Sequence, residues 1–537
     1  MKHSRYLTGL TLLIAIGLKT LLLFYDRFTI NADEAIVALM ARHILLNGER
    51  PIFFYGQAYM GSLDAYLVAL GFALFGFQVW VIRAVQIVLY GLVIYSAIKL
   101  VPLIFGHSHG KWYTAALLAV PTVNVTLYTT VSLGGYGEAL LIGNLILISG
   151  FKLLCCLEDE RLPPFWWLGS FGFWVGLGFW VNGLTGVYTL PMLLSLGLVG
   201  LRHRKVLDGR RTGLGLGVCC LAFLLGSLPW WMFAWREGMD GLIGELFGSA
   251  IATSQAGLLE QALRNFINLL LFGGTVLLGL RPPWEIRWLA LPLAPFAIAI
   301  WFALLGWWLR EMIIKKPNLQ QWVITGIGVT FSLAFVFTPF GGDPSGRYFL
   351  PLWVVLAIIA GEMVVRYIPS LRYQMGLISV LVVFNLWGVV ECAMRTPPGL
   401  TTQFDPVAAV DHRPMADLIR FLQEKGETRG YTNYWVAYPL AFLSEEQLIF
   451  SPRLPYHPDL RYTPRDDRYP AYTEQVLNSE RIAYITTNNP KLDETLTSQF
   501  RMANIRWQET WIGEYHVFYD LSAVLHPYQI GLGERFP

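Results

Sequence analysis

Charged side chains are scarce in this sequence. Only 14% of its 537 residues are charged, 55% are hydrophobic, and the mean hydropathy is +0.47. A chain of this composition is typical of a polytopic membrane protein. The net charge is only +3, so the sequence carries no basic signature of a nucleic-acid-binding protein and we expect no nucleic acid as a partner.

Cysteine is also rare, and its five positions fall in or at the edge of apolar segments. The polar C-terminal third has no cysteine, which excludes a disulfide framework or a zinc cluster there. That third also lacks a glycine-rich phosphate loop, so nucleotide binding has no support. His43 and His107 have no partners at metal-ligand spacing, so no metal site is predicted.

Apolar segments of about 20 residues, long enough to cross a membrane, recur along the chain. The first follows Lys2 and Arg5 and has no cleavage site after it, so it predicts an uncleaved span with a cytoplasmic N-terminus. We predict about 11 transmembrane helices at residues 7–25, 79–105, 112–132, 138–157, 165–182, 184–201, 213–234, 288–309, 321–338, 348–367 and 374–394.

The loops between these segments differ in charge. Basic residues gather in alternate loops, above all in RHRKVLDGRR at 202–211, whereas the opposite loops carry only Arg347. By the positive-inside rule the basic loops face the cytoplasm and the C-terminal region lies outside, in a bacterial type of plasma membrane. We place residues 235–287 outside as interface helices or a re-entrant piece.

The segment TINADEAIVALMARHILLNGERPIFFYGQAYMGSLDAYL, residues 29–67, is neither long nor apolar enough to be a span. Asn31 predicts a helix cap three residues before Glu34, and an apolar face follows at helical spacing. A Gly-Pro-aromatic turn and a second short apolar helix come next. We expect interface helices in a first outer loop, residues 26–78, with carboxylates at the membrane surface.

From about Pro397 the sequence becomes polar. It predicts helices at 413–427, 435–447 and 490–502, and strands at TRGYTNY, LIFSP, RIAYITT and in NIRWQETWIGEYHVFYDL. Alternating helices and strands indicate a small α/β domain. We therefore divide the chain into a transmembrane domain at 1–396 and an extracytoplasmic α/β domain at 397–537.

Two acidic positions stand out as candidates for chemistry. Asp33 and Glu34 would sit in the first turn of an interface helix, where a carboxylate can act as a general base toward a hydroxyl. Acidic residues there also favour the helix dipole without any other role. Glu138, in SLGGYGEAL at the outer end of a span, has the same two explanations. Asp64, after Ser62, is better explained as a cap.

Basic candidates lie at the outer ends of spans. Arg347 and Tyr348, in TPFGGDPSGRYFLPLW, suit a phosphate clamp, although Arg347 could instead pair with Asp343 or extend to the interface. Lys19 and Arg83 could also hold a phosphate, or could merely reach toward water.

These features, in this order, resemble the GT-C type of membrane glycosyltransferase, in particular the dolichyl-phosphate-mannose protein mannosyltransferase and aminoarabinose transferase group. The resemblance covers most of residues 1–367. It is carried by Asp33-Glu34, MARHILLNGE, PIFFYGQAYMGSLDAYL, FALFGFQVWVIR, the Gly-Tyr-Gly-Glu138 turn, GRYFLPLW and an outer soluble domain.

The resemblance implies an inverting transfer of a sugar, a hexose or a pentose, from a polyprenyl-phosphate donor to an acceptor outside the membrane. Asp33 would match the catalytic aspartate, Glu138 the second acidic position, and Arg347 a basic residue near the phosphate. The acceptor would be a lipid, a glycan or a protein. No metal is strictly implied, and a divalent metal is not excluded, because Arg and Lys can stabilise a phosphate leaving group.

One departure concerns the first loop. Relatives in the aminoarabinose branch have a lysine and prolines after a tyrosine, whereas here Tyr59 is followed by Met60-Gly61-Ser62-Leu63. This difference argues against that donor sugar and against a direct copy of its phosphate contacts.

Two other classes of protein compete with the enzyme. A transporter or lipid flippase would place charges near mid-membrane, often in repeated halves, and this sequence shows neither. A non-catalytic partner would use the outer domain only for binding, and Asp33 would then be a helix cap.

Overall fold

The computed structural model describes residues 2–203, 209–247, 257–343, 345–395 and 399–533, and it contains two compact units. The helical unit consists of Met1–Tyr25, Ala58–Asp64 and Arg83–Cys392. The α/β unit consists of Asp26–Gln57, Ala65–Ile82 and Ala393–Pro537. The first loop is therefore shared between the two units.

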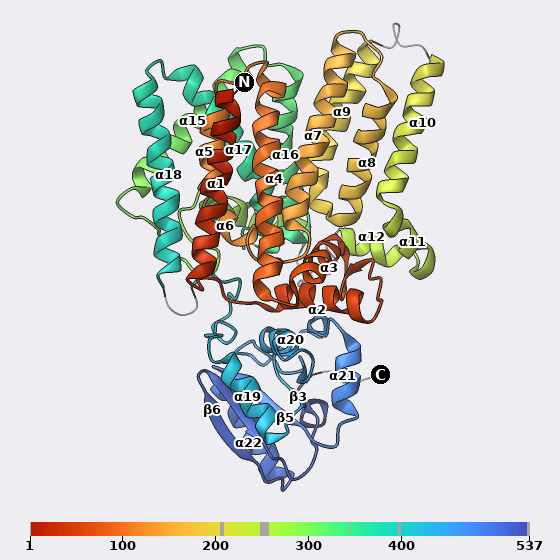
Figure 1. Cartoon of the computed structure of the whole chain (residues 1–537), viewed down its shortest axis with the longest axis vertical. Helices are drawn as coiled ribbons and strands as arrows, with labels where there is room; N and C mark the ends of the chain where they lie inside the picture. Colours follow the sequence, from red (N-terminus) through yellow and green to blue (C-terminus); the bar gives the residue numbers. More distant parts are fainter. Residues whose placement is uncertain (1, 204–208, 248–256, 344, 396–398, 534–537) are drawn as a thin grey trace. The chain divides into compact units, whose positions relative to one another are not determined.

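Long helices run side by side through the helical unit (Figure 1). Along the chain the helices are α1 (Lys2–Phe24), α4 (Val79–Phe105), α5 (Lys111–Ala119), α6 (Val123–Tyr128), α7 (Tyr136–Glu158), α8 (Phe165–Val181), η1 (Gly183–Thr185), α9 (Gly186–Arg202), α10 (Gly209–Gly226), α11 (Leu228–Glu237), α12 (Asp240–Leu246), α13 (Leu258–Ile267), η2 (Asn268–Gly273), α14 (Gly274–Leu277), α15 (Ala294–Ile314), α16 (Leu319–Phe337), η3 (Pro339–Gly342), η4 (Arg347–Phe349), α17 (Leu350–Tyr367) and α18 (Leu371–Ala393).

Within the described residues, eight helices are long and apolar enough to cross a membrane, or nine if the bent pair α10 and α11 forms one span. The described residues thus hold fewer full-length apolar helices than the eleven predicted segments. The segment 112–132 breaks at Pro121 into α5 and α6, because the residue before a proline disfavours helical backbone. Helix α8 has only 17 residues, and α10 and α11 meet at an angle of 65°.

The region 235–287 contains short helices. Its described part holds the end of α11, then α12, and then α13, η2 and α14, which follow one another without a break from Leu258 to Leu277. None of these is among the candidate spans, which must be apolar as well as long. Residues 248–256 lie outside the described residues. The predicted position of this region outside the membrane stays a prediction.

The loops predicted to face the cytoplasm gather at one end of the helical unit. The Gln320 side chain donates a hydrogen bond to Glu158 (2.9 Å), and Asn318 donates one to the carbonyl of Ile104 (2.9 Å). At the same end His107 lies 3.3 Å from Glu362. Segments far apart in sequence therefore meet through polar contacts at this end, while the predicted orientation in the membrane stays a prediction.

Helices α8 and α10 approach each other closely along glycine. A Cβ on Gly172 would lie 2.2 Å from the carbonyl oxygen of Cys219, and one on Gly176 would lie 2.1 Å from that of Phe223. Small residues four apart on one helix allow this backbone contact, a common way of packing helices in membranes.

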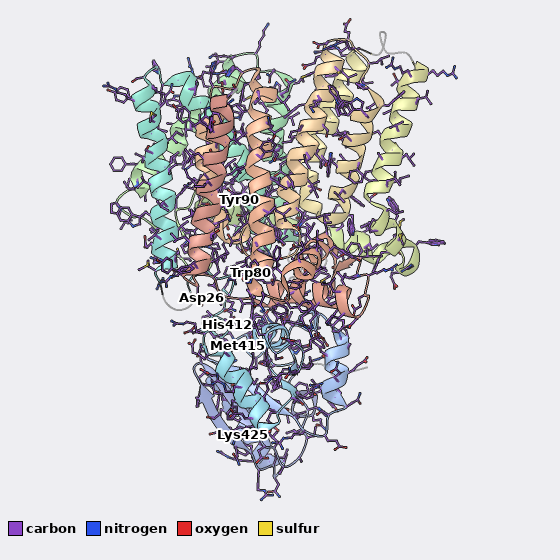
Figure 2. The ribbon with its side chains drawn as sticks, viewed as in Figure 1. Asp26, Trp80, Tyr90, His412, Met415 and Lys425 are labelled. Atoms are coloured by element: carbon purple, nitrogen blue, oxygen red, sulfur yellow. The ribbon has the colours of Figure 1, made fainter. Side chains whose placement is uncertain are left out.

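The C-terminal part of the α/β unit contains a five-stranded sheet of order β4-β3-β5-β7-β6. Strands β4, β3 and β5 pair in parallel, and β5, β7 and β6 pair antiparallel. The elements are α19 (Met415–Lys425), β3 (Arg429–Tyr431), α20 (Tyr434–Leu443), β4 (Ile449–Ser451), η5 (Pro464–Asp466), α21 (Pro470–Leu477), β5 (Ala483–Thr487), α22 (Pro490–Met502), β6 (Gln508–Ile512), β7 (Tyr515–Tyr519) and η6 (Pro527–Ile530). Figure 2 labels Met415 and Lys425, the first and last residues of α19.

The predicted α/β pattern is confirmed in element order. All three predicted helices and all five strands are present, and α22 has the predicted bounds. Helix α21 was not predicted. Buried apolar residues from α19, α20 and the strands, such as Leu418, Leu440 and Val517, form the core.

The first loop supplies α2 (Ala32–Leu46), β1 (Phe53–Phe54), β2 (Gln57–Gly61) and α3 (Leu63–Phe75). The predicted cap is confirmed, because the Asn31 side chain accepts a hydrogen bond from the Glu34 backbone (2.8 Å). Helix α2 packs against α20, and its burial extends beyond the predicted apolar stripe to almost every residue from Ala32 to Ala41. The short strands were not predicted.

Candidate functional site

Asp33 lies in the first turn of α2, within the α/β unit. Its side chain is partly buried, and the hydroxyl of Tyr434, at the start of α20, donates a hydrogen bond of 2.5 Å to Asp33 Oδ1. Two residues that are 401 positions apart in sequence are therefore joined by their functional groups. The adjacent Glu34 is fully buried.

Charged groups from η5 and the loop after it lie near this pair. The Arg468 guanidinium lies 5.6 Å from the centre of the Tyr434 ring, and the buried Asp466 interacts electrostatically with both Arg468 and Asp33. Burial raises the pKa of Asp466 to about 7, although Arg468 opposes the shift. A carboxyl group with such a pKa changes charge near neutral pH, beside Asp33.

Helix α2 is fixed by a second cluster one turn before its end. Arg42 donates to Glu446 (2.9 Å), and His43, buried on α2, contacts the other oxygen of Glu446 (2.9 Å). The hydroxyl of Tyr472 also donates to Glu446 (2.8 Å). Burial alone would raise the pKa of Glu446, but these bonds from His43, Tyr472 and Arg42 outweigh it and lower the pKa to about 2.

In the helical unit, Glu138 is paired with a second carboxylate. Asp64 and Glu138 are both buried and interact electrostatically, and Asp64 accepts hydrogen bonds from Gln86 (2.7 Å) and Ser132. Apart from Asp64, no side chain among the described residues bonds to Glu138. Burial raises the pKa of Asp64 and so favours its protonated form.

The turn before Glu138 has the geometry that its glycines predict. Gly134 and Gly135 both have positive φ, 79° and 82°, and Gly135 begins α7. A Cβ on Gly137 would lie 2.8 Å from Oε1 of Gln86, the residue whose Nε2 donates a hydrogen bond to Asp64. The turn therefore permits both the reversal of the chain and the close approach of α4.

Arg347 is held by an acidic neighbour. Its guanidinium forms an ion pair of 2.5 Å with Asp343 and lies 5.1 Å from the centre of the Tyr348 ring. The pairing with Asp343 that the sequence allowed is thus present. The hydroxyl of Tyr348 and Nε of Arg347 are buried and have no hydrogen-bond partner among the described residues, so both could still bind an anion.

A cavity of about 480 Å³ lies in the helical unit next to this arginine. Tyr59, Tyr136 and Tyr348 form part of its wall, and the rest is largely apolar. Further wall residues come from α8, η1, α9 and α16, among them Phe179, Asn182, Leu190, Phe331, Ala334 and Phe335. The cavity combines largely apolar walls with three tyrosines, and Arg347 lies against the ring of one of them, Tyr348. This combination suits an amphiphilic anion.

Two predicted phosphate ligands lie elsewhere. The Lys19 ammonium is buried between α1 and α6, bonded to the carbonyl of Thr126 (3.2 Å) and the hydroxyls of Thr129 (2.7 Å) and Thr130 (2.6 Å). Its ammonium also faces the ring of Tyr90, which Figure 2 labels on α4, at 4.6 Å. An ammonium has three donors, so Lys19 is satisfied within the helices. Arg83 is buried near the start of α4.

The predicted residues thus fall into groups. Glu138 joins Asp64, while Tyr59, Arg347 and Tyr348 gather at or beside the cavity; Asp33 and Glu34 belong to the α/β unit. Tyr434 and Asp466 were not predicted from the sequence, where the only indication of them is that the C-terminal domain is rich in Tyr and Asp. Asp64 was predicted to be a helix cap only. In the described residues, no group of three or more His, Cys, Asp or Glu is arranged to hold a metal ion.

Comparison with known proteins agrees with this geometry. Residues 62–230 match the family model described as dolichyl-phosphate-mannose-protein mannosyltransferase. A search of curated protein sequences finds no significant match.

Solved structures show the same fold over almost the whole chain. ArnT from Cupriavidus metallidurans bound to undecaprenyl phosphate aligns with a TM-score of 0.58 and 14% identity, covering 97% of this chain and 98% of that one. The Archaeoglobus fulgidus oligosaccharyltransferase in complex with Zn and sulfate aligns with a TM-score of 0.53 and 12% identity, over 93% of this chain and 69% of that one. AglB from the same organism, in complex with an inhibitory peptide and a dolichol-phosphate, aligns with a TM-score of 0.51 and 12% identity, over 90% and 69%. The resemblance to GT-C membrane proteins is confirmed.

Proposed function

We propose that this chain is an inverting glycosyltransferase that moves a sugar from a polyprenyl-phosphate donor to an acceptor hydroxyl. The observation that carries the proposal is the largely apolar cavity of about 480 Å³, with Tyr59, Tyr136 and Tyr348 in its wall and Arg347 against the Tyr348 ring. An isoprenoid tail needs apolar walls, and a phosphate needs donors at one end. The fold is shared with proteins crystallised with undecaprenyl phosphate and dolichol-phosphate.

Asp33 is the proposed general base. The acceptor hydroxyl gives its proton to the Asp33 carboxylate while its oxygen forms a bond to the anomeric carbon of the sugar. The bond between that carbon and the phosphate oxygen breaks, and the phosphate leaves with the electron pair. A single displacement inverts the anomeric centre. Arg347 and the tyrosine hydroxyls stabilise the charge on the leaving phosphate.

The acidic pair of the helical unit has a separate role in this proposal. Glu138 is buried beside Asp64, with which it interacts, and no other side chain among the described residues bonds to it. Its carboxyl oxygens can accept hydrogen bonds from sugar hydroxyls. We assign Glu138 to the binding of the donor sugar, at the outer face of a bacterial plasma membrane, with a lipid, glycan or protein as acceptor.

The first test measures transfer of labelled sugar from a panel of polyprenyl-phosphate sugars. It compares wild type with Asp33→Asn and with Asp26→Asn, an exposed aspartate seven residues earlier that serves as the control. All three proteins are first shown to express and melt alike. Loss of a general base lowers kcat by roughly 100- to 10,000-fold, so we expect that loss in Asp33→Asn alone. Equal transfer by all three would remove Asp33 from the chemistry.

The cavity is tested by filling it. Ala334→Trp places a ring in the cavity wall, whereas Leu333→Trp places the same ring on the exposed side of α16. We expect Ala334→Trp to raise KM for long-chain donors more than for short-chain ones, and Leu333→Trp to change neither. If Ala334→Trp raised KM equally for long-chain and short-chain donors, the cavity would not be the binding site of the lipid tail. A wild type that transfers from no donor would overturn the proposal and make lipid transport the next activity to assay.

A further inference from the structure

We propose that Tyr434 is a positioning residue for Asp33, so that the C-terminal domain contributes directly to the site of proton transfer. The inference rests on the proposed role of Asp33 as base. Its starting point is the 2.5 Å hydrogen bond from the Tyr434 hydroxyl to Asp33 Oδ1. Both residues belong to the α/β unit.

The Tyr434 side chain is itself held in place. It is 4% exposed, and its ring meets those of Trp435 and Tyr438 edge to face at 5.2 and 5.5 Å. Asn433 caps α20 by accepting a hydrogen bond from the Trp435 backbone (3.0 Å). The hydroxyl therefore reaches Asp33 from a rigid helix start, which a loop side chain could not do as precisely.

The hydrogen bond selects between the two oxygens of Asp33. A phenol donating to Oδ1 stabilises the charged carboxylate and leaves Oδ2 as the atom that receives the acceptor's proton. It also fixes the plane of the carboxylate, which determines whether Oδ2 points at an acceptor. Capping does not explain this contact, because the cap of α2 is Asn31 and Tyr434 donates to a side chain.

Two other charged groups face the pair, and both belong to the same unit. Asp466, whose negative form would repel the Asp33 carboxylate, is buried beside Arg468, and Arg468 lies against the Tyr434 ring. Arg468 offsets the repulsion between the two carboxylates. The start of α20 thus supplies a donor, η5 an acid and the loop after η5 a cation, all near one carboxylate of α2.

The test compares Tyr434→Phe with wild type in the transfer assay, using the donor that the panel identifies. The substitution keeps the buried ring and removes only the hydroxyl. A hydrogen bond to a charged group is worth roughly 10- to 100-fold, so we expect kcat to fall by that factor with KM for the donor unchanged. The acid limb of the kcat profile moves to higher pH, because the charged carboxylate has lost a donor.

Controls separate positioning from folding. Tyr431→Phe removes another buried hydroxyl of the same domain, one that contacts His526 at 2.7 Å, and should leave kcat and its pH profile unchanged. Tyr434→His keeps a ring with an N–H donor and should restore part of the lost kcat. If Tyr434→Phe melts well below wild type, Tyr434→His is compared with wild type instead. A shifted kcat–pH profile of Tyr434→His then supports the positioning role, and an unshifted one contradicts it.

The outcomes also separate this inference from the function beneath it. If Asp33→Asn is inactive while Tyr434→Phe keeps full activity and an unchanged pH profile, the positioning role of Tyr434 is overturned and Asp33 remains the base. Asp33→Asn as active as wild type would overturn the proposed base, and the positioning role with it. A Tyr434→Phe protein that loses stability but keeps its kcat and pH profile would assign Tyr434 to packing alone.

Discussion

The ammonium of Lys19 is an example of a charge whose partners are all internal. Its bonds to Thr126, Thr129 and Thr130 join α1 to α6, and Tyr90 covers it from α4. Although its place near the end of a span suggested a phosphate ligand, this geometry favours a structural role. The role at the phosphate itself stays a prediction.

Lys19→Met should therefore act on stability. The substitution leaves buried carbonyl and hydroxyl oxygens without a donor, at a cost of about 1–3 kcal/mol. We expect a lower melting temperature in detergent with KM for the donor nearly unchanged in the protein that remains folded. Lys99→Met, on the exposed side of α4, is the matched control. A stable Lys19→Met protein with a strongly raised KM for the donor would instead assign Lys19 to binding of the donor phosphate.

Asp466 gives a prediction about pH. Burial raises the pKa of its carboxyl from 3.8 to about 7, so the folded state binds a proton that the unfolded state releases. Stability due to this group is highest below pH 3.8, falls as the pH rises toward 7, and is constant above that. The penalty at pH 8 is on the order of 4 kcal/mol.

Asp466→Asn should remove that penalty. We expect the variant to melt above wild type at pH 8 and close to wild type at pH 4, as measured by thermal unfolding across pH. Asp459→Asn, at an exposed position seven residues earlier, should run parallel to wild type between pH 4 and pH 8, because the lowered pKa of Asp459 keeps its carboxyl charged over that range. Parallel pH curves for Asp466→Asn and wild type would show that Asp466 is not protonated by folding.

At the scale of elements, glycine determines the contact between α8 and α10. A methyl group on Gly176 would meet the backbone of Phe223, which cannot move as a side chain can. We expect Gly176→Ala to lower stability by about 1–3 kcal/mol, measured by thermal unfolding. Gly217→Ala, on α10 with no atom near the added methyl, should be neutral or slightly stabilising. Equal stability of the two variants would contradict direct backbone contact.

Regular elements could be predicted from the sequence because their signals are local. The α/β pattern after Pro397 and the cap at Asn31 depend on residues a few positions apart, and both are confirmed. The predicted segments outnumber the full-length helices of the described residues because hydropathy does not register where a helix breaks, as at Pro121, or bends, as between α10 and α11. Short strands such as β1 leave no periodic signal.

The site could be predicted only in part, for a reason of distance along the chain. Asp33, Glu138 and Arg347 were recognisable as rare charges at the ends of spans, but their partners come from elsewhere. Tyr434 lies 401 positions from Asp33, and Asp64 lies 74 positions from Glu138. Nothing in a sequence pattern of 10 or 20 residues brings such groups together.

At the scale of the whole molecule, Glu446 joins the first loop to the C-terminal domain. Its pKa is lowered to about 2 by bonds from His43, Tyr472 and Arg42 that outweigh burial. A lowered pKa means stability that is present above pH 4.5 and lost as the pH falls toward 2. Helix α2 should therefore loosen from the domain on acidification.

Glu446→Gln should show this looseness already at pH 7. We expect faster proteolysis within residues 26–57 and a melting temperature a few degrees lower, with the difference from wild type disappearing near pH 2. Glu445→Gln is the matched control, because the Glu445 side chain is exposed and its carboxylate lies as far as 4.0 Å from Arg42. Identical proteolysis of both variants at pH 7 would show that the bonds of Glu446 to Arg42 and His43 do not hold α2.

The discontinuous α/β unit has a consequence for how the protein is made. Its first segment, Asp26–Gln57, leaves the ribosome early, but α20, the helix against which α2 packs, is synthesised almost 400 residues later. Until then α2 has its buried face uncovered and Asp33 has no Tyr434. An unfinished chain therefore cannot hold the assembled carboxylate site, and the order of synthesis delays any chemistry at Asp33 until the C-terminal domain has folded around it.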